Sequence, residues 1–296
     1  MDEMKVGIVD VGSNTVRLLV ASVGGGEVRS LQEERAHLGL GEEILLHGRV
    51  RRRKLAELAE VATEFGRIAR KHRVRELETV VTAPGRQGDA PERLLKVLRR
   101  TTGAPVRIVS AEDEGRLAYT GAVARTEVGS RVAGVCDVGG GSTEVVVGTS
   151  LLGPAWVRSV DVGSLRLTAS FLHGDPPAAA EIERARAAVR VALTEIAPPL
   201  PELALATGGS ARAIARIVGC AYDADRLQHV IAALASRSAE QTSRELALPF
   251  HRARTLIAGS LILAEVSRLL GVELTPAKGG IREGAALQLA AQRAAA

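Results

Sequence analysis

Short β-branched runs alternate with amphipathic stretches along this chain, and this alternation is typical of a layered α/β protein. Leu58, Ala62 and Phe65 recur at three- and four-residue spacing, which predicts one face of a helix over residues 55–69. Further helices are predicted at 91–100, 110–125 and 211–218, and strands at 6–11, 15–23, 28–32, 77–81, 106–109 and 203–206, with another strand beginning at 132.

The opening strand–turn–strand pattern recurs about half-way along the chain. Val6-Gly-Ile-Val-Asp10-Val-Gly12-Ser-Asn-Thr matches Ala133-Gly-Val-Cys-Asp137-Val-Gly139-Gly-Gly-Ser-Thr143. One repeat of this length predicts two duplicated domains rather than a solenoid. The length of 296 residues agrees with this, since a domain typically takes about 150 residues. A cleft between two such domains would bring their glycine turns face to face.

Each copy places an acid at a strand end, followed by a turn rich in glycine and hydroxyl residues. Such a turn can direct several backbone N–H groups at an oxyanion, and Ser13, Thr15, Ser142 and Thr143 would add hydroxyl donors. Neither turn has the context of a P-loop or of a G-x-G-x-x-G dinucleotide site. A plain hairpin turn would explain one copy alone, but two copies in register favour anion binding.

Two further glycine clusters lie in the second half of the chain. Thr207-Gly208-Gly209-Ser210 joins a strand to a helix whose N-terminus favours an anion. Lys278 and Arg282 flank a glycine pair ahead of the last helix. A tight strand-to-helix connection and a capped helix start are the respective alternatives.

Glu114 stands apart from the acids that helix capping explains. Ser110 and Asp113 fit a capping box, so helix capping explains why an acid stands at position 113. Glu114 lies one position further, and its helical neighbours Ala118 and Gly121 are small, which leaves room for water or substrate.

Three other acids lie on apolar strands, where a carboxylate needs a partner. Asp10, Asp137 and Glu144 have this setting. Mg²⁺ held by one or two carboxylates and by phosphate oxygens is one solution. Salt bridges to Arg17 or Arg166 are the alternative.

The net charge of +5 indicates anionic partners. Arginine is dense over residues 49–54, which predicts a basic channel for a polyanion, with a solvated helix start as the alternative. Aromatic residues make up only 2% of the chain, which argues against a single-strand nucleic-acid binder that stacks bases on rings.

Several classes of protein are excluded by the sequence. No apolar run reaches the roughly 18 residues of a membrane span, and the acidic N-terminus is unlike a signal peptide. Cys136 and Cys220 form no C-x-x-C pair, and no two histidines have H-x-x-x-H spacing. We therefore expect a cytoplasmic protein without a disulfide framework or a histidine metal site.

Three motifs, in order, closely resemble those of the exopolyphosphatase and guanosine pentaphosphate phosphohydrolase family. They are Asp10-Val-Gly-Ser-Asn-Thr-Val-Arg17-Leu, Ser110-Ala-Glu-Asp-Glu114-Gly-Arg116-Leu and Asp137-Val-Gly-Gly-Gly-Ser-Thr-Glu144. Val162-Gly-Ser-Leu-Arg166, Ala206-Thr-Gly-Gly-Ser210 and Gly280-Ile-Arg-Glu-Gly284 resemble its later motifs, so the resemblance covers nearly the whole chain.

The resemblance implies an α/β fold of two actin-like (ribonuclease H-like) domains with an active-site cleft between them. We expect these domains at 1–125 and 126–296, with the last helix, at 281–294, packing back on the first. The chain resembles the short, two-domain form of the family, which lacks the C-terminal helical region of longer members.

The same resemblance assigns roles to residues. Glu114 occupies the position of the catalytic glutamate that activates water, and Asp137 and Glu144 match acids associated with Mg²⁺ or another divalent cation such as Mn²⁺. The implied phosphate-contacting residues are Gly12, Ser13, Asn14, Arg17, Arg86, Gly139, Gly140, Gly141, Ser142, Thr143, Gly208, Gly209 and Ser210.

The expected function is that of an exopolyphosphatase, which hydrolyses terminal phosphate from inorganic polyphosphate. Hydrolysis of pppGpp is the alternative, because that nucleotide presents the same terminal phosphoanhydride. An actin-like ATP-dependent kinase is less favoured, because Glu114 at a helix start suits water, and the intact acids disfavour a sensor that only binds. A homodimer is expected, with no membrane and no specific nucleic acid as partner.

Two positions depart from the pattern of the family. The family usually has Ala-Thr-x-Ala-x-Arg-x-Ala-x-Asn where this chain keeps Thr82 and Arg86 but has Pro84-Gly85 between them and lacks the Asn. Arg254 stands where the family commonly has Asp.

Overall fold

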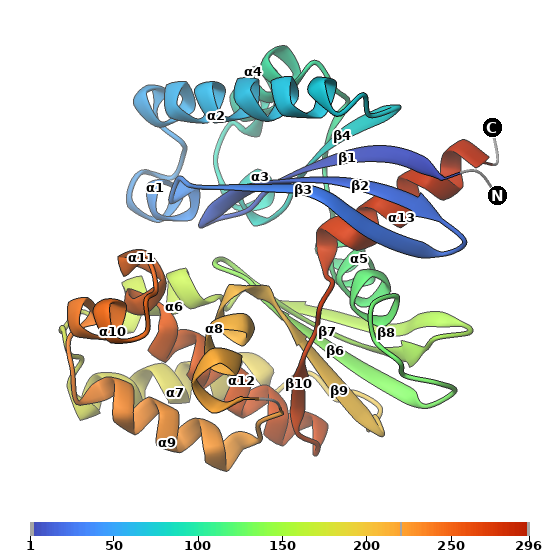
Figure 1. Ribbon diagram of the computed structural model, residues 1–296. Coiled ribbons are helices and arrows are strands. Elements are labelled where there is room, and N and C mark those ends of the chain that lie inside the picture. Colours follow the sequence, from blue (N-terminus) through green and yellow to red (C-terminus); the bar gives the residue numbers. More distant parts are fainter. Residues whose placement is uncertain (1–2, 220, 295–296) are drawn as a thin grey trace. The chain divides into compact units, whose positions relative to one another are not determined.

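The computed structural model describes residues 3–219 and 221–294, so Cys220 lies outside the described residues. They form two compact units (Figure 1). The first unit runs to Arg125 and resumes at Gly279, and the second is Thr126–Lys278. Within the described ranges, no helix combines the length and the apolar character that a membrane span requires.

The first unit is built on a five-stranded sheet with the order β3-β2-β1-β4-β5. Its strands are β1 (Met4–Val11), β2 (Thr15–Gly24), β3 (Glu27–His37), β4 (Glu76–Val81) and β5 (Val106–Ile108). β1, β2 and β3 form an antiparallel meander, and β4 and β5 extend the sheet in parallel from β1. Its helices are α1 (Leu40–His47), α2 (Arg52–Lys71), α3 (Ala83–Gln87), α4 (Pro91–Thr102), α5 (Ala111–Val123) and α13 (Ile281–Ala294).

The alternation of side chains along β1 decides which helices cover each face of this sheet. Val9 and Val11 belong to a buried cluster with residues of α2 and α4. Val6 and Ile8 belong to a second cluster with residues of α5 and α13. Both faces are therefore apolar, and Figure 1 shows the two pairs of helices on opposite sides of the sheet.

α13 reaches this sheet because glycines let its backbone meet that of α5. A side chain on Gly121 would come within 2.0 Å of the Gly280 carbonyl oxygen, and one on Gly284 within 2.0 Å of the Leu117 carbonyl oxygen. The expectation of open space for water or substrate along this face of α5 is wrong at Gly121, because α13 fills it. The Gly280 amide donates to Glu283 at 2.8 Å, so this glycine cluster begins a capped helix.

The second unit repeats the strand plan of the first. Its sheet has the order β10-β9-β6-β7-β8, from β6 (Val132–Val138), β7 (Thr143–Thr149), β8 (Gly153–Val160), β9 (Leu203–Thr207) and β10 (Leu274–Pro276). Three strands again form an antiparallel meander and two join in parallel. Its helices are α6 (Ser164–Phe171), α7 (Ala179–Leu193), α8 (Gly208–Val218), α9 (Ala224–Ala235), α10 (Ala239–Glu245), α11 (Phe250–Arg254) and α12 (Leu256–Leu270). The repeat in the sequence is thus a repeat of topology.

Candidate active site

The first glycine turn, residues 12–14, connects β1 to β2, and α1 fixes its backbone. The Gly41 amide donates to the Ser13 carbonyl at 2.7 Å, and the Gly39 amide donates to the Asn14 carbonyl at 3.1 Å. A trans peptide directs its N–H opposite to its C=O. The amides that follow these carbonyls therefore point away from α1.

Two side chains of the first turn carry buried donors that lack a protein partner. The Ser13 hydroxyl and the Asn14 amide nitrogen make no hydrogen bond to any described residue. The Asn14 amide oxygen accepts a hydrogen bond from His37 Nε2 at 2.7 Å, which turns the NH₂ group the other way. Buried donors without partners are uncommon and indicate a missing ligand or water. An anion at this turn would satisfy both.

Asp10 and Arg17 lie directly opposite each other where β1 and β2 meet this turn. Asp10 has the same strand parity as Ile8, so it lies on the face of the sheet that α5 covers. Arg17 donates from Nε to the Thr15 hydroxyl at 3.2 Å, which holds its guanidinium beside the turn. Opposite charges in such cross-strand positions are stabilising.

Glu114 lies in the first turn of α5, as the sequence predicts. The Ser110 hydroxyl caps that helix by accepting from the Asp113 amide at 3.0 Å. Glu114 is only 5% exposed, and Arg86 Nη1 donates to its Oε2 at 2.6 Å. The same nitrogen donates to the Val109 carbonyl at 2.8 Å, so Arg86 is itself fixed. The ion pair orients a buried carboxylate.

α3 brings Arg86 to this position, and the Pro84-Gly85 departure lies within it. Pro84 occupies the first turn of the helix, where a proline is tolerated. A Cβ on Gly85 would lie 3.0 Å from methyl or methylene carbons of both Val81 and Ile108. The small residue therefore lets α3 approach β4 and β5 closely.

The second glycine turn, residues 139–142, connects β6 to β7 and has the same backbone plan. The Ser164 amide donates to the Gly139 carbonyl at 2.9 Å, and the Arg166 amide donates to the Gly140 carbonyl at 3.0 Å. α6 thus holds the carbonyls, as α1 does in the first unit. The Thr143 hydroxyl donates to the Val162 carbonyl at 2.5 Å, so it stabilises the loop that carries α6.

Asp137 and Glu144 lie directly opposite each other beside the second turn, and both are buried. The Ser159 hydroxyl donates to Glu144 Oε1 at 2.8 Å. The described residues contain no cluster of three or more His, Cys, Asp or Glu that could hold a metal. Two acids nevertheless suit Mg²⁺, which usually takes one or two carboxylates and fills its other positions with water and phosphate oxygens.

Gly208 and Gly209 lie close to charged groups at the start of α8. Gly208 has φ +94, and a side chain there would come within 3.1 Å of Asp137 Oδ1. A side chain on Gly209 would come within 2.2 Å of Arg252 Nη2, so that guanidinium lies over the Gly209 backbone. Arg252 is only 8% exposed, and no sequence motif identifies it as a site residue. The basic run 251–254 is its only signal, and such a run is also typical of an exposed helix.

Two other residues of this region have clear surroundings. The Ser210 hydroxyl lies against α12, since a side chain on Gly259 would come within 2.2 Å of it. Arg254, the departure from Asp, donates to the Leu172 carbonyl at 2.6 Å. This carbonyl belongs to the C-terminal end of α6, so Arg254 anchors the helix that holds the second turn.

The duplicated sheets, with an acid and a glycine turn at the same place in each, define a protein of the two-domain actin-like fold. The chain belongs to the Ppx/GppA phosphatase family, whose model matches residues 19–293. The family expected from the sequence motifs is confirmed.

Individual relatives agree with this assignment. The chain is 30% identical to a Mycobacterium tuberculosis protein named exopolyphosphatase 1, over 96% of this chain and 88% of the relative. It is also 30% identical to exopolyphosphatase 2 of the same organism, over 97% of this chain and 98% of the relative. A crystal structure of the Aquifex aeolicus family member, 24% identical, has a TM-score of 0.84 and matches over 99% of both chains.

Proposed function

We propose that this protein is an exopolyphosphatase that releases terminal phosphate from inorganic polyphosphate. The observation that carries the proposal is the buried Glu114 carboxylate, which Arg86 holds at 2.6 Å in the first turn of α5. A fixed, buried acid is suited to accept a proton from water. The names of the mycobacterial relatives support polyphosphate as the substrate.

In the proposed reaction, Glu114 takes a proton from a water molecule whose oxygen attacks the terminal phosphorus. The bridging P–O bond breaks, and its electron pair leaves with the shortened polyphosphate chain. Orthophosphate and the shortened chain are the products. Phosphoryl transfer mainly requires positioned groups and neutralised oxygen charge, so one acid and several anion-binding groups suffice.

The glycine turns would bind the phosphate oxygens. In the first unit, the turn amides and the buried donors of Ser13 and Asn14 are the candidate contacts. In the second unit, the amides after Gly139 and Gly140 play this part, and Arg252 adds a guanidinium over Gly209. Each contact stabilises negative charge that the phosphate already carries and that shifts during bond cleavage.

Asp137 and Glu144 fit the requirement for a divalent cation. They are buried carboxylates directly opposite each other on neighbouring strands, where like charges disfavour each other and a bound cation would offset the repulsion. Bound there, Mg²⁺ or Mn²⁺ would neutralise charge on phosphate oxygens.

The test is phosphate release from long polyphosphate, short polyphosphate and pppGpp, measured side by side with and without Mg²⁺. We expect Mg²⁺-dependent release from polyphosphate. Release from pppGpp alone would replace the proposal by the alternative nucleotide hydrolase. ATP-dependent phosphorylation of an acceptor without phosphate release would overturn hydrolysis and indicate a kinase.

We also propose a homodimer in the cytoplasm. Both rest on the resemblance of the sequence to the short form of the family. Light scattering coupled to size-exclusion chromatography tests the dimer, and fractionation of cells tests the location.

A further inference from the structure

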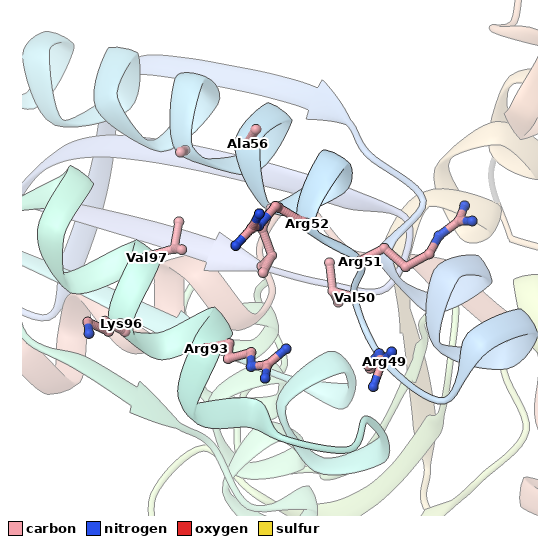
Figure 2. Close-up of a pocket in the computed structure, with 10 residues that line it drawn as sticks. Arg49, Val50, Arg51, Arg52, Ala56, Arg93, Lys96 and Val97 are labelled. Atoms are coloured by element: carbon pink, nitrogen blue, oxygen red, sulfur yellow. The ribbon is translucent and has the colours of Figure 1, made fainter.

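A cavity of about 640 Å³ lies in the first unit between α2 and α4 (Figure 2). This volume is typical of a small-molecule site. The cavity shares no lining residue with the first turn, Arg86 or Glu114, so it belongs to a different part of the unit. Its lining consists of Arg49, Val50, Arg51, Arg52, Leu55, Ala56, Ala59, Arg93, Lys96 and Val97.

Four cations of this lining lack an acidic partner. Arg49, Arg52, Arg93 and Lys96 form no salt bridge with any carboxylate of the described residues. The neighbouring Arg51 differs, because its Nε donates to Glu43 at 2.9 Å. Figure 2 shows the Arg51 side chain extending away from the others. Four uncompensated positive charges around one cavity repel each other unless an anion binds among them.

The stretch 49–54, which is predicted from the sequence to form a basic channel, contains residues with different surroundings. Lys54 pairs with Glu57 at 2.5 Å, and Arg53 lies 3.9 Å from the same carboxylate. With Arg51 held by Glu43, Arg52 is the member of the run 51–54 that faces the cavity without a carboxylate. The remaining positive charge comes from α4 and from the residues before α2.

The start of α2 favours an anion for a second reason. This helix is 20 residues long, has no acid in its first turn and has no side chain capping its N-terminus. The exposed amides of a helix start carry partial positive charge, and the cationic side chains here add to it. A bound anion would satisfy the amides and offset the charge.

The apolar part of the lining indicates what kind of anion binds. Val50, Leu55, Ala56, Ala59 and Val97 form that part. An inorganic phosphate chain has no group that gains from apolar contact, whereas a planar base does. We propose that this cavity binds a nucleoside polyphosphate, with its phosphates on Arg52 and Arg93 and its base on the aliphatic side chains. The site goes beyond the proposed exopolyphosphatase activity and does not depend on it.

The test measures the Kd of a non-hydrolysable nucleoside triphosphate for two matched double variants. Arg52→Ala/Arg93→Ala removes two guanidinium groups from the cavity. Arg99→Ala/Arg100→Ala removes two exposed ones from the other end of α4. Because both lose the same charge, their difference isolates the cavity from nucleotide bound elsewhere. We expect the first pair to weaken binding at least about tenfold relative to the second, since each lost contact is charge-assisted.

Two further measurements distinguish a nucleotide site in this cavity from nucleotide binding elsewhere and from a site for inorganic phosphate chains. Ala56→Glu places a negative charge on an exposed lining position and should also weaken nucleotide binding at least about tenfold. Inorganic triphosphate should compete with the nucleotide only weakly, and kcat on short polyphosphate should not change in Arg52→Ala/Arg93→Ala. Equal Kd values in the two double variants would overturn the site. Competition by inorganic triphosphate as strong as by the nucleotide would overturn the base-binding part.

Discussion

The two glycine turns share one backbone plan and differ in the charges beside it. In the first unit Asp10 faces Arg17 across two antiparallel strands, whereas in the second Asp137 faces Glu144 at the equivalent place. Opposite charges in such positions are stabilising and like charges are destabilising. The duplicated frame thus carries an acid opposite a base in the first unit and two acids opposite each other in the second. This difference is the reason why we propose the divalent cation site in the second unit.

The helices that hold the turns are also anchored by different chemistry. α1 holds the first turn, and Glu43 on α1 pairs with Arg51 at the start of α2. α6 holds the second turn, and Arg254 binds the Leu172 carbonyl at its end. Only the first anchor contains a carboxylate that titrates, so acid should affect the two turns unequally.

The largest effect is expected for Glu114→Gln. If the first unit supplies the base, kcat should fall by about 10²–10⁴, while the fold and the half-saturating Mg²⁺ concentration stay as in the wild type. Steady-state kinetics on polyphosphate measures both quantities. Glu112→Gln is the matched control, because Glu112 lies in the same helical turn, is exposed and pairs with Arg116. A Glu114→Gln enzyme with wild-type kcat would contradict the assignment.

A smaller effect is expected for the acids of the second turn. Asp137→Asn and Glu144→Gln should each raise the half-saturating Mg²⁺ concentration by about tenfold or more, because each removes a negative ligand. A magnesium titration of activity measures this. Asp10→Asn, at the equivalent place in the first unit, is the control and should leave that concentration unchanged. If neither second-turn variant shifts the titration, these acids serve the structure instead.

Substitutions of Glu144 and Asp10 should change the stability of the folded protein in opposite directions. This comparison is made after a chelator has removed divalent cations. Glu144→Gln relieves a like-charge pair and should stabilise the protein, whereas Asp10→Asn weakens an opposite-charge pair and should destabilise it. Each change is expected to be roughly 0.2–1 kcal/mol, which corresponds to a shift in Tm of about 0.4–4 °C. Thermal unfolding followed by circular dichroism measures both. Shifts of the same sign would remove the electrostatic contrast.

A further contrast between the two units concerns acid and the anchor of α1. Hydrogen bonds from Arg51 lower the pKa of the Glu43 carboxyl from 4.5 to about 2. Since the folded-state pKa lies below the unfolded one, the pair stabilises the protein fully above pH 4.5 and loses that contribution as pH falls towards about 2. The wild type should therefore exceed Glu43→Gln in stability by about 1 kcal/mol near neutrality.

Denaturant unfolding at a series of pH values measures this difference. It should shrink as the pH falls below 4.5. Arg254→Ala is the counterpart in the second unit, and its cost should stay constant over the same range because a carbonyl does not titrate. A pH-independent cost for Glu43→Gln would show that the ion pair contributes nothing.

Strands and helices could be predicted where hydrophobic residues recur with a strong period along the chain. They could not be predicted where this period is weak. The β-branched strands at the start of each unit follow their predicted ranges, as does α2. β3 extends to His37 although the pattern predicts a strand only over 28–32. It is an edge strand whose polar residues Glu33 and Glu34 hide the alternation. α12 is buried on nearly all sides, so it lacks the polar face that identifies a helix.

Some residues of the candidate site could likewise be predicted from the sequence, and others could not. The position of Glu114 follows from local capping geometry, because Ser110 and Asp113 fix the start of α5. Its pairing with Arg86 depends on how α3 packs on β4 and β5, which no local pattern encodes. Arg252 approaches Gly209 from a helix more than 40 residues further along the chain. Local signals thus locate the acids and the turns, and tertiary packing supplies the arginines.

The return of α13 to the first unit has a consequence for the order of events on the ribosome. Residues 281–294 are synthesised after every residue of the second unit, which is one continuous segment. Until then, the apolar face of the first sheet that contains Val6 and Ile8 lacks part of its cover. Domains generally fold as units during synthesis. The unit that begins second can therefore complete its folding first, and the nascent first unit is the segment that a chaperone would need to protect.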